Sequence, residues 1–209
     1  MTVCFKRFEY GLGIANQKNM IYHEKFSIKE DNLMKTTNNN ILSTKINIKA
    51  AVEENINLGL LETDCKKMSA GLSLLLADSY ILYLKTHNYH WNVTGINFLA
   101  LHQLFMKQYT ELALAVDLIA ERIRALGFPA PATFIEYSEL SSIKEETGVK
   151  TDLRMISSLN KSHEAIIRTI RYLLTIASSI KDHSTVDLLT QRLIIHEKSA
   201  WMLRSLLAT

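Results

Sequence analysis

Four residues of types that bind transition metals stand in the middle of the chain. They are His90, His102, Asp117 and Glu121, at successive separations of twelve, fifteen and four positions. Imidazole nitrogens combined with carboxylate oxygens suit Fe²⁺, Zn²⁺ or Mn²⁺. The two acids, four residues apart on one helix face, repel each other unless a cation lies between them. The pattern therefore predicts a metal site made of two histidines and two acids.

One chain cannot bring these four side chains together. On a single helix, His102 and Asp117 lie about 22 Å apart along the axis, whereas the ligands of one metal converge within a few Å. A two-fold pairing of antiparallel helices would place the histidine end of one chain against the acid end of the other. The spacing predicts a dimer with two equivalent sites between subunits.

Each of these residues also has a simpler interpretation. A single histidine on a helix is more often packed or exposed than a metal ligand, and Asp117 could pair with Arg122 or Arg124 at the surface. Other catalytic motifs are missing from the sequence, among them the Glu-x-x-His pairs of di-iron bundles, His-Glu-x-x-His, a glycine-rich phosphate loop and a nucleophile elbow. Four further histidines match no ligand pattern and are interpreted as packed or surface residues: His87, His163, His183 and His196.

Long helices must position these residues. With only 7 Gly and 2 Pro, and with apolar residues recurring every three or four positions, the chain favours uninterrupted helices. We expect four, at about 62–92, 97–126, 151–180 and 184–207. Gly95 should end the first, Asn97 should cap the second, and Thr151 or Asp152 should cap the third. The predicted fold is an all-α four-helix bundle, with a short helix near 135–142 in the link between the second and third helices.

The second helix carries a further apolar stripe beside its core-facing one. At about 100° per residue, the members of this second stripe lie within about 40° of His102. A helix that is apolar on two stripes is central to a bundle or faces a partner subunit. The stripe is formed by Met106, Tyr109, Ala113 and Ala120.

The basic excess of the chain lies in its first quarter. Residues 1–50 hold eight Lys/Arg against four Asp/Glu, a net +4, while the remaining 24 − 8 = 16 basic and 21 − 4 = 17 acidic residues give −1. We interpret 1–50 as a basic, disordered N-terminal tail and 51–209 as the folded domain. The tail is either a solvated segment or a DNA-binding arm. Its cationic residues are Lys6, Arg7, Lys18, Lys25, Lys29, Lys35, Lys45 and Lys49.

The remaining composition favours a soluble cytoplasmic protein. Two cysteines, Cys4 and Cys65, make neither a disulfide framework nor a CxxC site. No signal peptide opens the chain. The most apolar run, 72–84, contains Asp78 and is too short to span a bilayer. We therefore expect no membrane partner.

Two segments together resemble a known family. "THNYHWNVTGINFLALHQLF" and "VDLIAERIRALG" are similar to the Dps family, the mini-ferritins named as DNA-binding proteins from starved cells. The family pattern reads His-Trp, then Gly and Phe, then Leu/Val-His, then Asp-x-x-Ala-Glu-Arg. The likeness covers about residues 60–209, and the separations of the four ligand positions match.

The resemblance implies a ferritin-like bundle assembled into a twelve-subunit shell, associated with the nucleoid where DNA is bound. It further implies that Fe²⁺ is oxidised at sites between two-fold-related subunits, typically by hydrogen peroxide, and stored inside as ferric mineral. Carried over by position, His90 and His102 come from one subunit, and Asp117 and Glu121 from the other. Trp91 matches a family tryptophan beside the site that is thought to intercept oxidising equivalents.

This chain departs from the family at several positions. Many members have an acid four residues after the second histidine, where this chain has Met106, and Glu directly after that histidine, where it has Gln103. The second iron position is therefore expected to be weak or filled through water. Along the iron-access channel, Asp182 and Asp187 remain, and we expect the residues between and after them to dilute the negative field: His183, Ser184 and Arg192.

Overall fold

The computed structural model describes residues 56–148 and 150–208. Within this part of the chain the regular elements are helices, and four of them are long: α2 (Glu62–Asn92), α3 (Phe98–Ala125), α5 (Asp152–Ser179) and α6 (His183–Leu207). The short α4 (Phe134–Leu140) lies in the link between α3 and α5. The predicted bundle, its four helices and the short helix in the link are confirmed. The predicted tail, 1–50, lies outside the described residues.

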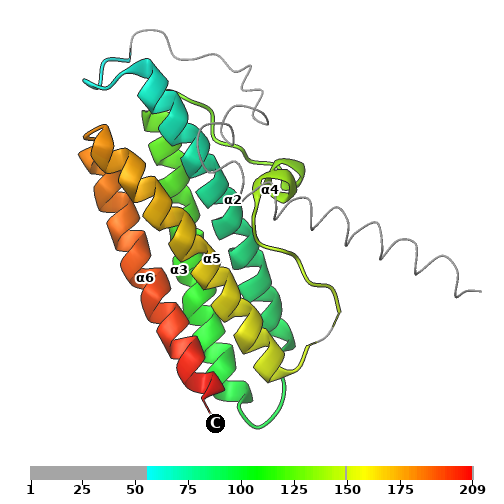
Figure 1. The fold of residues 1–209 in the computed structure, drawn as a ribbon. Coiled ribbons are helices and arrows are strands. Elements are labelled where there is room, and N and C mark those ends of the chain that lie inside the picture. The colour runs from blue at the N-terminus through cyan, green and yellow to red at the C-terminus, as the bar shows by residue number, and fades with distance from the viewer. Residues whose placement is uncertain (1–55, 149, 209) are drawn as a thin grey trace, which may run out of the picture. The chain divides into compact units, whose positions relative to one another are not determined.

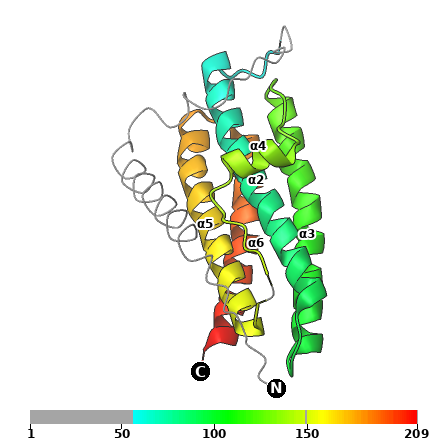
Figure 2. The same cartoon turned by 90° about the vertical axis from the view of Figure 1, so that its right-hand side faces the viewer.

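The four long helices lie side by side in two closely packed pairs (Figures 1 and 2). α2 packs along α3, and α5 packs along α6; α2 also contacts α5, and α3 contacts α6. α4 lies against α2 on the outside of the bundle. The link that carries α4 returns the chain along the bundle, so that α5 begins at the end where α2 finishes. The link between α3 and α5 is therefore a crossover from one end of the bundle to the other.

The core lies between the four helices and is built from the stripes that the sequence indicated. Gly71, in the first third of α2, marks a close approach to α5, because a Cβ built there would lie 2.4 Å from Cδ2 of Leu173. Removing this apolar surface from water is the main stabilising term of the bundle. Fully buried side chains from α2, α3 and α5 include Leu72, Leu75, Leu82, Leu101, Phe105, Leu112, Ile119, Ile123, Ile166 and Ile170.

Helix ends differ in how they are capped. Thr151 caps α5, accepting a hydrogen bond from the Arg154 amide, as predicted. Thr133 forms a reciprocal capping box with Glu136 at the start of α4. Asn97 occupies the N-cap position of α3, but its side chain makes no capping hydrogen bond. The prediction for Asn97 was therefore right about the helix boundary and wrong about the cap.

Buried polar contacts attach the link to α2. Asp78 is 1% exposed, and its carboxylate accepts hydrogen bonds from the Ser141 hydroxyl and from both the amide and the hydroxyl of Ser142. Nζ of Lys85, two turns further along α2, donates to the carbonyl oxygen of Lys144 at 2.7 Å. These contacts fix the path of the link and hold α4 against the bundle.

Candidate metal centre

His90 and His102 lie together although twelve residues separate them. His90 is near the end of α2 and His102 near the start of α3, so the turn between the two helices brings their rings into contact. The rings stack, with centroids 3.8 Å apart and an interplanar angle of 20°. Nδ1 of each ring lies 2.9 Å from the main-chain oxygen of the other residue. The pairing of the two histidines predicted from the sequence is therefore present within one chain.

These two hydrogen bonds determine the protonation of both rings. A carbonyl oxygen can only accept, so Nδ1 of His90 and Nδ1 of His102 must each carry a proton. In the neutral imidazole the other nitrogen, Nε2, then keeps a free lone pair. A main-chain carbonyl that orients a histidine through its second nitrogen is the usual outer contact of a metal-binding imidazole. In this tautomer Nε2 of each ring is an unprotonated nitrogen, the form of imidazole that can bind a metal.

Aromatic rings continue from the histidine pair toward the surface. Tyr109 lies edge-on to His90, with centroids 5.1 Å apart, and stacks on His87 at 4.2 Å. His87 in turn lies 4.0 Å from Trp91, which is 62% exposed. His87 and Trp91 are four residues apart on α2, a spacing that brings side chains together on a helix. That spacing could have identified this contact, whereas Tyr109 was assigned only to the apolar stripe.

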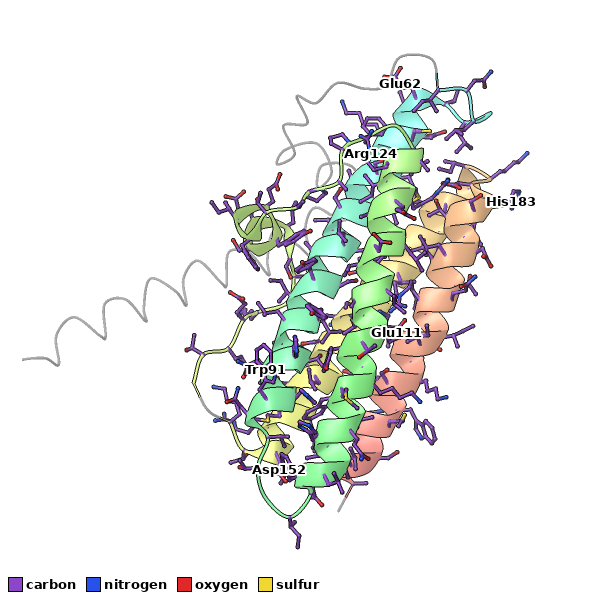
Figure 3. The ribbon with its side chains drawn as sticks, turned by 180° about the vertical axis from the view of Figure 1, so that it is seen from behind. Glu62, Trp91, Glu111, Arg124, Asp152 and His183 are labelled. Carbon is purple, nitrogen blue, oxygen red and sulfur yellow. The ribbon has the colours of Figure 1, made fainter. Side chains whose placement is uncertain are left out.

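Asp117 and Glu121 lie far along α3 from the histidine pair. Both are exposed, and neither has a side-chain hydrogen bond or ion pair with another described residue. Figure 3 labels Trp91 toward one end of the bundle and Arg124, three residues beyond Glu121, toward the other. Within the described ranges, no three His, Cys, Asp or Glu side chains gather closely enough to hold a metal. The structure brings two of the four predicted ligands together and leaves the acids apart.

Arg122 does not pair with Asp117, which was one alternative for that acid. Its guanidinium donates to Asp182 at 2.6 Å and to the Thr185 hydroxyl at 2.8 Å, joining the end of α3 to the start of α6. Burial alone would raise the pKa of Asp182, but hydrogen bonds from Thr185 and Arg122 hold it below its usual range. Asp182 also caps α6 by accepting from the Thr185 amide.

The expectation for the iron-access channel is therefore corrected. Asp182 is 3% exposed and neutralised by Arg122, so it adds no free charge to a channel surface. Arg192, expected to dilute the field, is also 3% exposed and pairs with Glu111 inside the bundle. Of the charged residues considered, only Asp187 is an exposed acid. The pattern of charges in the sequence could not distinguish helix-capping and core charges from surface ones.

A surface that could receive a second chain runs along α3. Met106 and Ala113 of the predicted second stripe are exposed, and Tyr109 and Ala120 are half-buried. Further apolar side chains extend the exposed surface of this helix: Leu99, Leu114 and Leu118, at 64%, 68% and 51% exposure. Several exposed apolar side chains on one helix are typical of a protein–protein interface.

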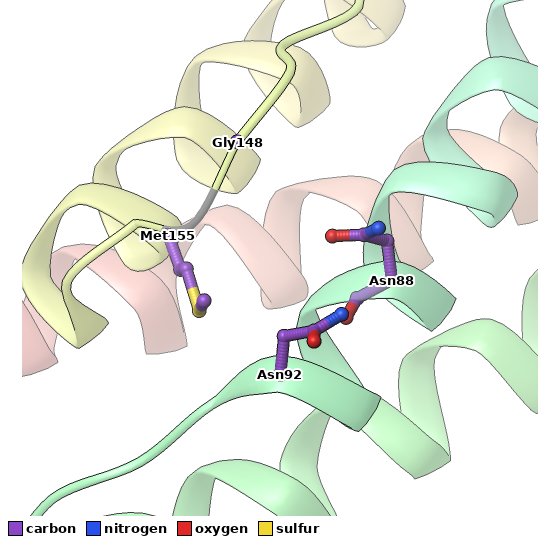
Figure 4. A pocket seen from close by; sticks show the side chains of 4 residues that line it. All are labelled: Asn88, Asn92, Gly148 and Met155. Carbon is purple, nitrogen blue, oxygen red and sulfur yellow. The ribbon is translucent and has the colours of Figure 1, made fainter.

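Two other polar features lie near the ends and the middle of the bundle. A pocket at the end of α2 is lined by Asn88, Asn92, Gly148 and Met155 (Figure 4), and none of these is an ionisable group. In the core, His163 and His196 form a buried pair, with Nδ1 atoms 2.9 Å apart. The sequence interpretation of both histidines as packed residues is consistent with this position.

Comparison with known proteins gives the class of the fold. A ferritin-like domain model matches residues 69–209. The structure of a Dps protein from Vibrio cholerae O1, described as a member of a broad superfamily of ferritin-like diiron-carboxylate proteins, superposes with a TM-score of 0.71. The two sequences are 31% identical, and the matched region covers 76% of this chain and 99% of the Vibrio chain. A Dps protein from Bacillus brevis superposes with a TM-score of 0.68, at 33% identity, covering 70% and 98%.

The chain is also similar in sequence to curated bacterial proteins. "DNA protection during starvation protein 2" of Bacillus anthracis is 39% identical over 142 residues, which are 68% of this chain and 97% of that protein. A "DNA protection during starvation protein" of Brevibacillus brevis is 35% identical over 136 residues. The fold is thus that of the ferritin-like proteins, and the chain belongs to the Dps family. Among the described residues, no helix is long and apolar enough to cross a membrane.

Proposed function

We propose that this protein is a ferroxidase that oxidises Fe²⁺, with hydrogen peroxide as oxidant, at sites shared between two subunits. The observation that carries the proposal is the reciprocal hydrogen bonding of His90 and His102, which leaves both Nε2 atoms free to bind a metal. Asp117 and Glu121 of a second chain complete the site. The exposed apolar surface of α3 is the surface on which the two chains pair.

The ligand types suit iron as a substrate that arrives ferrous and leaves ferric. Neutral imidazoles bind Fe²⁺, and carboxylate oxygens favour the harder Fe³⁺, so the mixed set makes oxidation easier. Two Fe²⁺ ions supply one electron each to one molecule of peroxide, which takes up two protons and gives two molecules of water. Because both electrons arrive together, no hydroxyl radical is released. In this proposal Trp91 intercepts oxidising equivalents that escape, and its ring contacts through His87 and Tyr109 to His90 support that role.

The second iron position is the weaker one in this proposal. Met106, where many family members carry an acid, is 44% exposed and offers only a thioether. Gln103 is exposed too. Water would then supply the missing ligands of the second ion. We expect the two ions to bind with clearly different affinities.

An anaerobic titration with Fe²⁺ followed by peroxide tests the proposal. The wild-type protein should give ferric absorbance at a rate far above that of iron in buffer. The double variant His102→Ala/Asp117→Ala should lose that excess rate, because each substitution removes a ligand from every site. A variant that oxidises iron as fast as the wild type would contradict the proposal.

DNA protection is a second candidate function, favoured by the names of the curated relatives. We propose that the protein assembles into a closed shell, a dodecamer in the family pattern, and stores ferric iron inside it, in a bacterial cytoplasm. Twelve basic tails on one particle would bind DNA multivalently even if each bound weakly. The tail, 1–50, and the eight cationic residues assigned to it lie outside the described residues.

A gel-shift titration at several salt concentrations tests this second function. The full chain should retard DNA, and retardation should weaken steeply as salt rises. A protein lacking residues 1–50 should shift DNA much less, provided that both proteins form particles of the expected size. Equal shifts for the two proteins would show that the tail does not contribute to DNA binding.

A further inference from the structure

A row of polar side chains crosses the inside of the bundle between α3, α6 and α5. Arg192 of α6 forms a two-pronged ion pair with Glu111 of α3: Nη1 donates to Oε1, and Nη2 donates to Oε2 at 3.0 Å. Nη2 also lies 3.2 Å from Nε2 of His196. His196 continues the row through its contact with His163 of α5. Figure 3 labels Glu111 midway along α3, well below Arg124 in that view.

Arg192 fixes the protons along this row. A guanidinium can only donate, so Nε2 of His196 accepts, and the proton of that ring is on Nδ1. Nδ1 of His196 therefore donates to Nδ1 of His163, and the proton of His163 is on Nε2. Burial, with the nearby charge of Arg192, lowers the pKa of His163 to about 3. Burial, with His163 and Arg192 adding to it, lowers the pKa of His196 well below its ordinary value.

Nη2 of Arg192 lies between two side-chain atoms of the kind that bind metal ions. Its two neighbours, a carboxylate oxygen of Glu111 and an unprotonated imidazole nitrogen of His196, are donors that first-row divalent ions bind. These atoms lie 3.0 and 3.2 Å from Nη2, so each would need to move about 1 Å closer to reach an ordinary metal–ligand distance of about 2.1 Å. Ferritin-like bundles commonly place their metals in this region, between side chains of facing helices. Here a cationic side chain is there instead.

Residues of this row and one neighbour on α3 also carry buried polar atoms without a hydrogen-bond partner among the described residues. Both amide atoms of Gln108, one turn before Glu111 on α3, are buried without a hydrogen-bond partner among the described residues. Nε of Arg192 and Nε2 of His163 are in the same condition. Buried polar groups normally find partners in protein or in water. If water fills the space left when the Arg192 side chain is removed, the amide of Gln108 and Nε2 of His163 would offer it hydrogen bonds while it hydrates a bound ion.

We propose that Arg192 is the internal cation of this bundle, whose guanidinium closes a latent divalent-metal site formed by Glu111 and His196 and so excludes iron from the core. The latent site takes a first-row divalent ion such as Co²⁺, Zn²⁺ or Fe²⁺. Without Arg192, the carboxylate of Glu111, only 33% exposed in its side chain, loses its counter-charge. A divalent ion restores that balance, because an unpaired, partly buried charge is costly.

Co²⁺ binding to full-length variants tests this inference. Equilibrium dialysis should show that Arg192→Ala binds one more Co²⁺ per chain than the wild type. The visible absorption of Co²⁺ should also change, because the added ion has a nitrogen ligand. The extra ion should also raise the thermal midpoint of Arg192→Ala. Arg192→Lys keeps the positive charge and should gain no ion. Arg192→Ala/Glu111→Gln removes both charges together, should fold without metal, and should gain none.

The same measurement in a His90→Ala/His102→Ala background separates this site from the one between subunits. The gain of one ion on replacing Arg192 should persist there, so the result does not depend on the proposed function. Three outcomes would overturn the inference: an assembled Arg192→Ala protein that binds no more Co²⁺ than its parent, an Arg192→Lys protein that gains the ion too, or an Arg192→Ala protein that fails to fold with and without Co²⁺.

Discussion

Nδ1 of His90 donates to the main-chain oxygen of His102, and Nδ1 of His102 donates to the main-chain oxygen of His90, each across 2.9 Å. This reciprocal pair joins the end of α2 to the start of α3 and presents two free Nε2 lone pairs from one chain. It also makes each histidine a structural partner of the other. Variants at either position should be judged on folding as well as on metal binding.

Replacing His102 by alanine should lower the affinity for Fe²⁺, measured anaerobically, by about tenfold or more. The substitution removes one ligand and also the side chain that stacks on His90 and holds it in place. His183→Ala is the matched control, since His183 is exposed at the start of α6, far from this pair. Equal losses in the two variants would show that His102 is not a ligand.

Metal binding should quench the fluorescence of Trp91 but not that of Trp201. Trp91 contacts His87 next to the histidine pair, whereas Trp201 lies on α6; both are well exposed, at 62% and 59%. In Trp91→Phe, Co²⁺ should no longer change the emission, and in Trp201→Phe the wild-type change should persist. A response that disappears with Trp201 instead would place the metal elsewhere.

The buried histidine pair should make the fold sensitive to acid. An unfolded histidine titrates near pH 6.5, whereas the pKa of His163 in the folded chain is about 3. Between these values the unfolded chain binds a proton that the folded chain does not, so the free energy of unfolding falls as pH falls. The slope is at most about 1.4 kcal/mol per pH unit for each such histidine, and above about pH 6.5 it vanishes.

Urea unfolding at a series of pH values measures this slope. His163→Gln should make the dependence between pH 6.5 and 3 shallower, because one titrating group has gone. His183→Gln removes an exposed histidine and should keep the wild-type slope. An unchanged slope in His163→Gln would mean that His163 does not contribute to acid sensitivity.

Removing the carboxylate of Asp78 should loosen the link that carries α4. Asp78→Ala leaves the donors from Ser141 and Ser142 without their acceptor, at a cost of about 2–4 kcal/mol in the free energy of unfolding. Asp187→Ala, at an exposed position on α6, should change stability by less than about 0.5 kcal/mol. A loss at Asp78 no larger than at Asp187 would contradict this anchoring role.

The sequence predicted the helices well because their apolar periodicity is strong. Leu101, Phe105 and Leu112 recur at helical spacing in the sequence, and all are fully buried on α3. The pairing of His90 with His102 was also predictable, since a short turn joins the two helices. The ion pairs of Asp182 and Arg192 could not be predicted. A charged residue gives the same sequence pattern whether it caps a helix, pairs in the core or faces solvent.

The buried polar row could not be predicted from the sequence, for a different reason. It runs from Glu111 through Arg192 and His196 to His163. Its members come from three helices, and Glu111 and Arg192 are 81 positions apart. Only the packing of α6 against both α3 and α5 reveals that a carboxylate, a guanidinium and two imidazoles meet. By contrast, the distance between His102 and Asp117 follows from helix geometry alone, and so the need for two chains could be deduced in advance.

Subunit mixing tests the central claim, that each site combines histidines of one chain with acids of another. His102→Ala and Asp117→Ala proteins should each be inactive in Fe²⁺ oxidation. When equal amounts are unfolded and reassembled together, half of the two-fold pairs are mixed, and each mixed pair has one intact site and one doubly defective site. The account predicts recovery of about a quarter of the wild-type rate. No recovery, in particles of wild-type size, would contradict it.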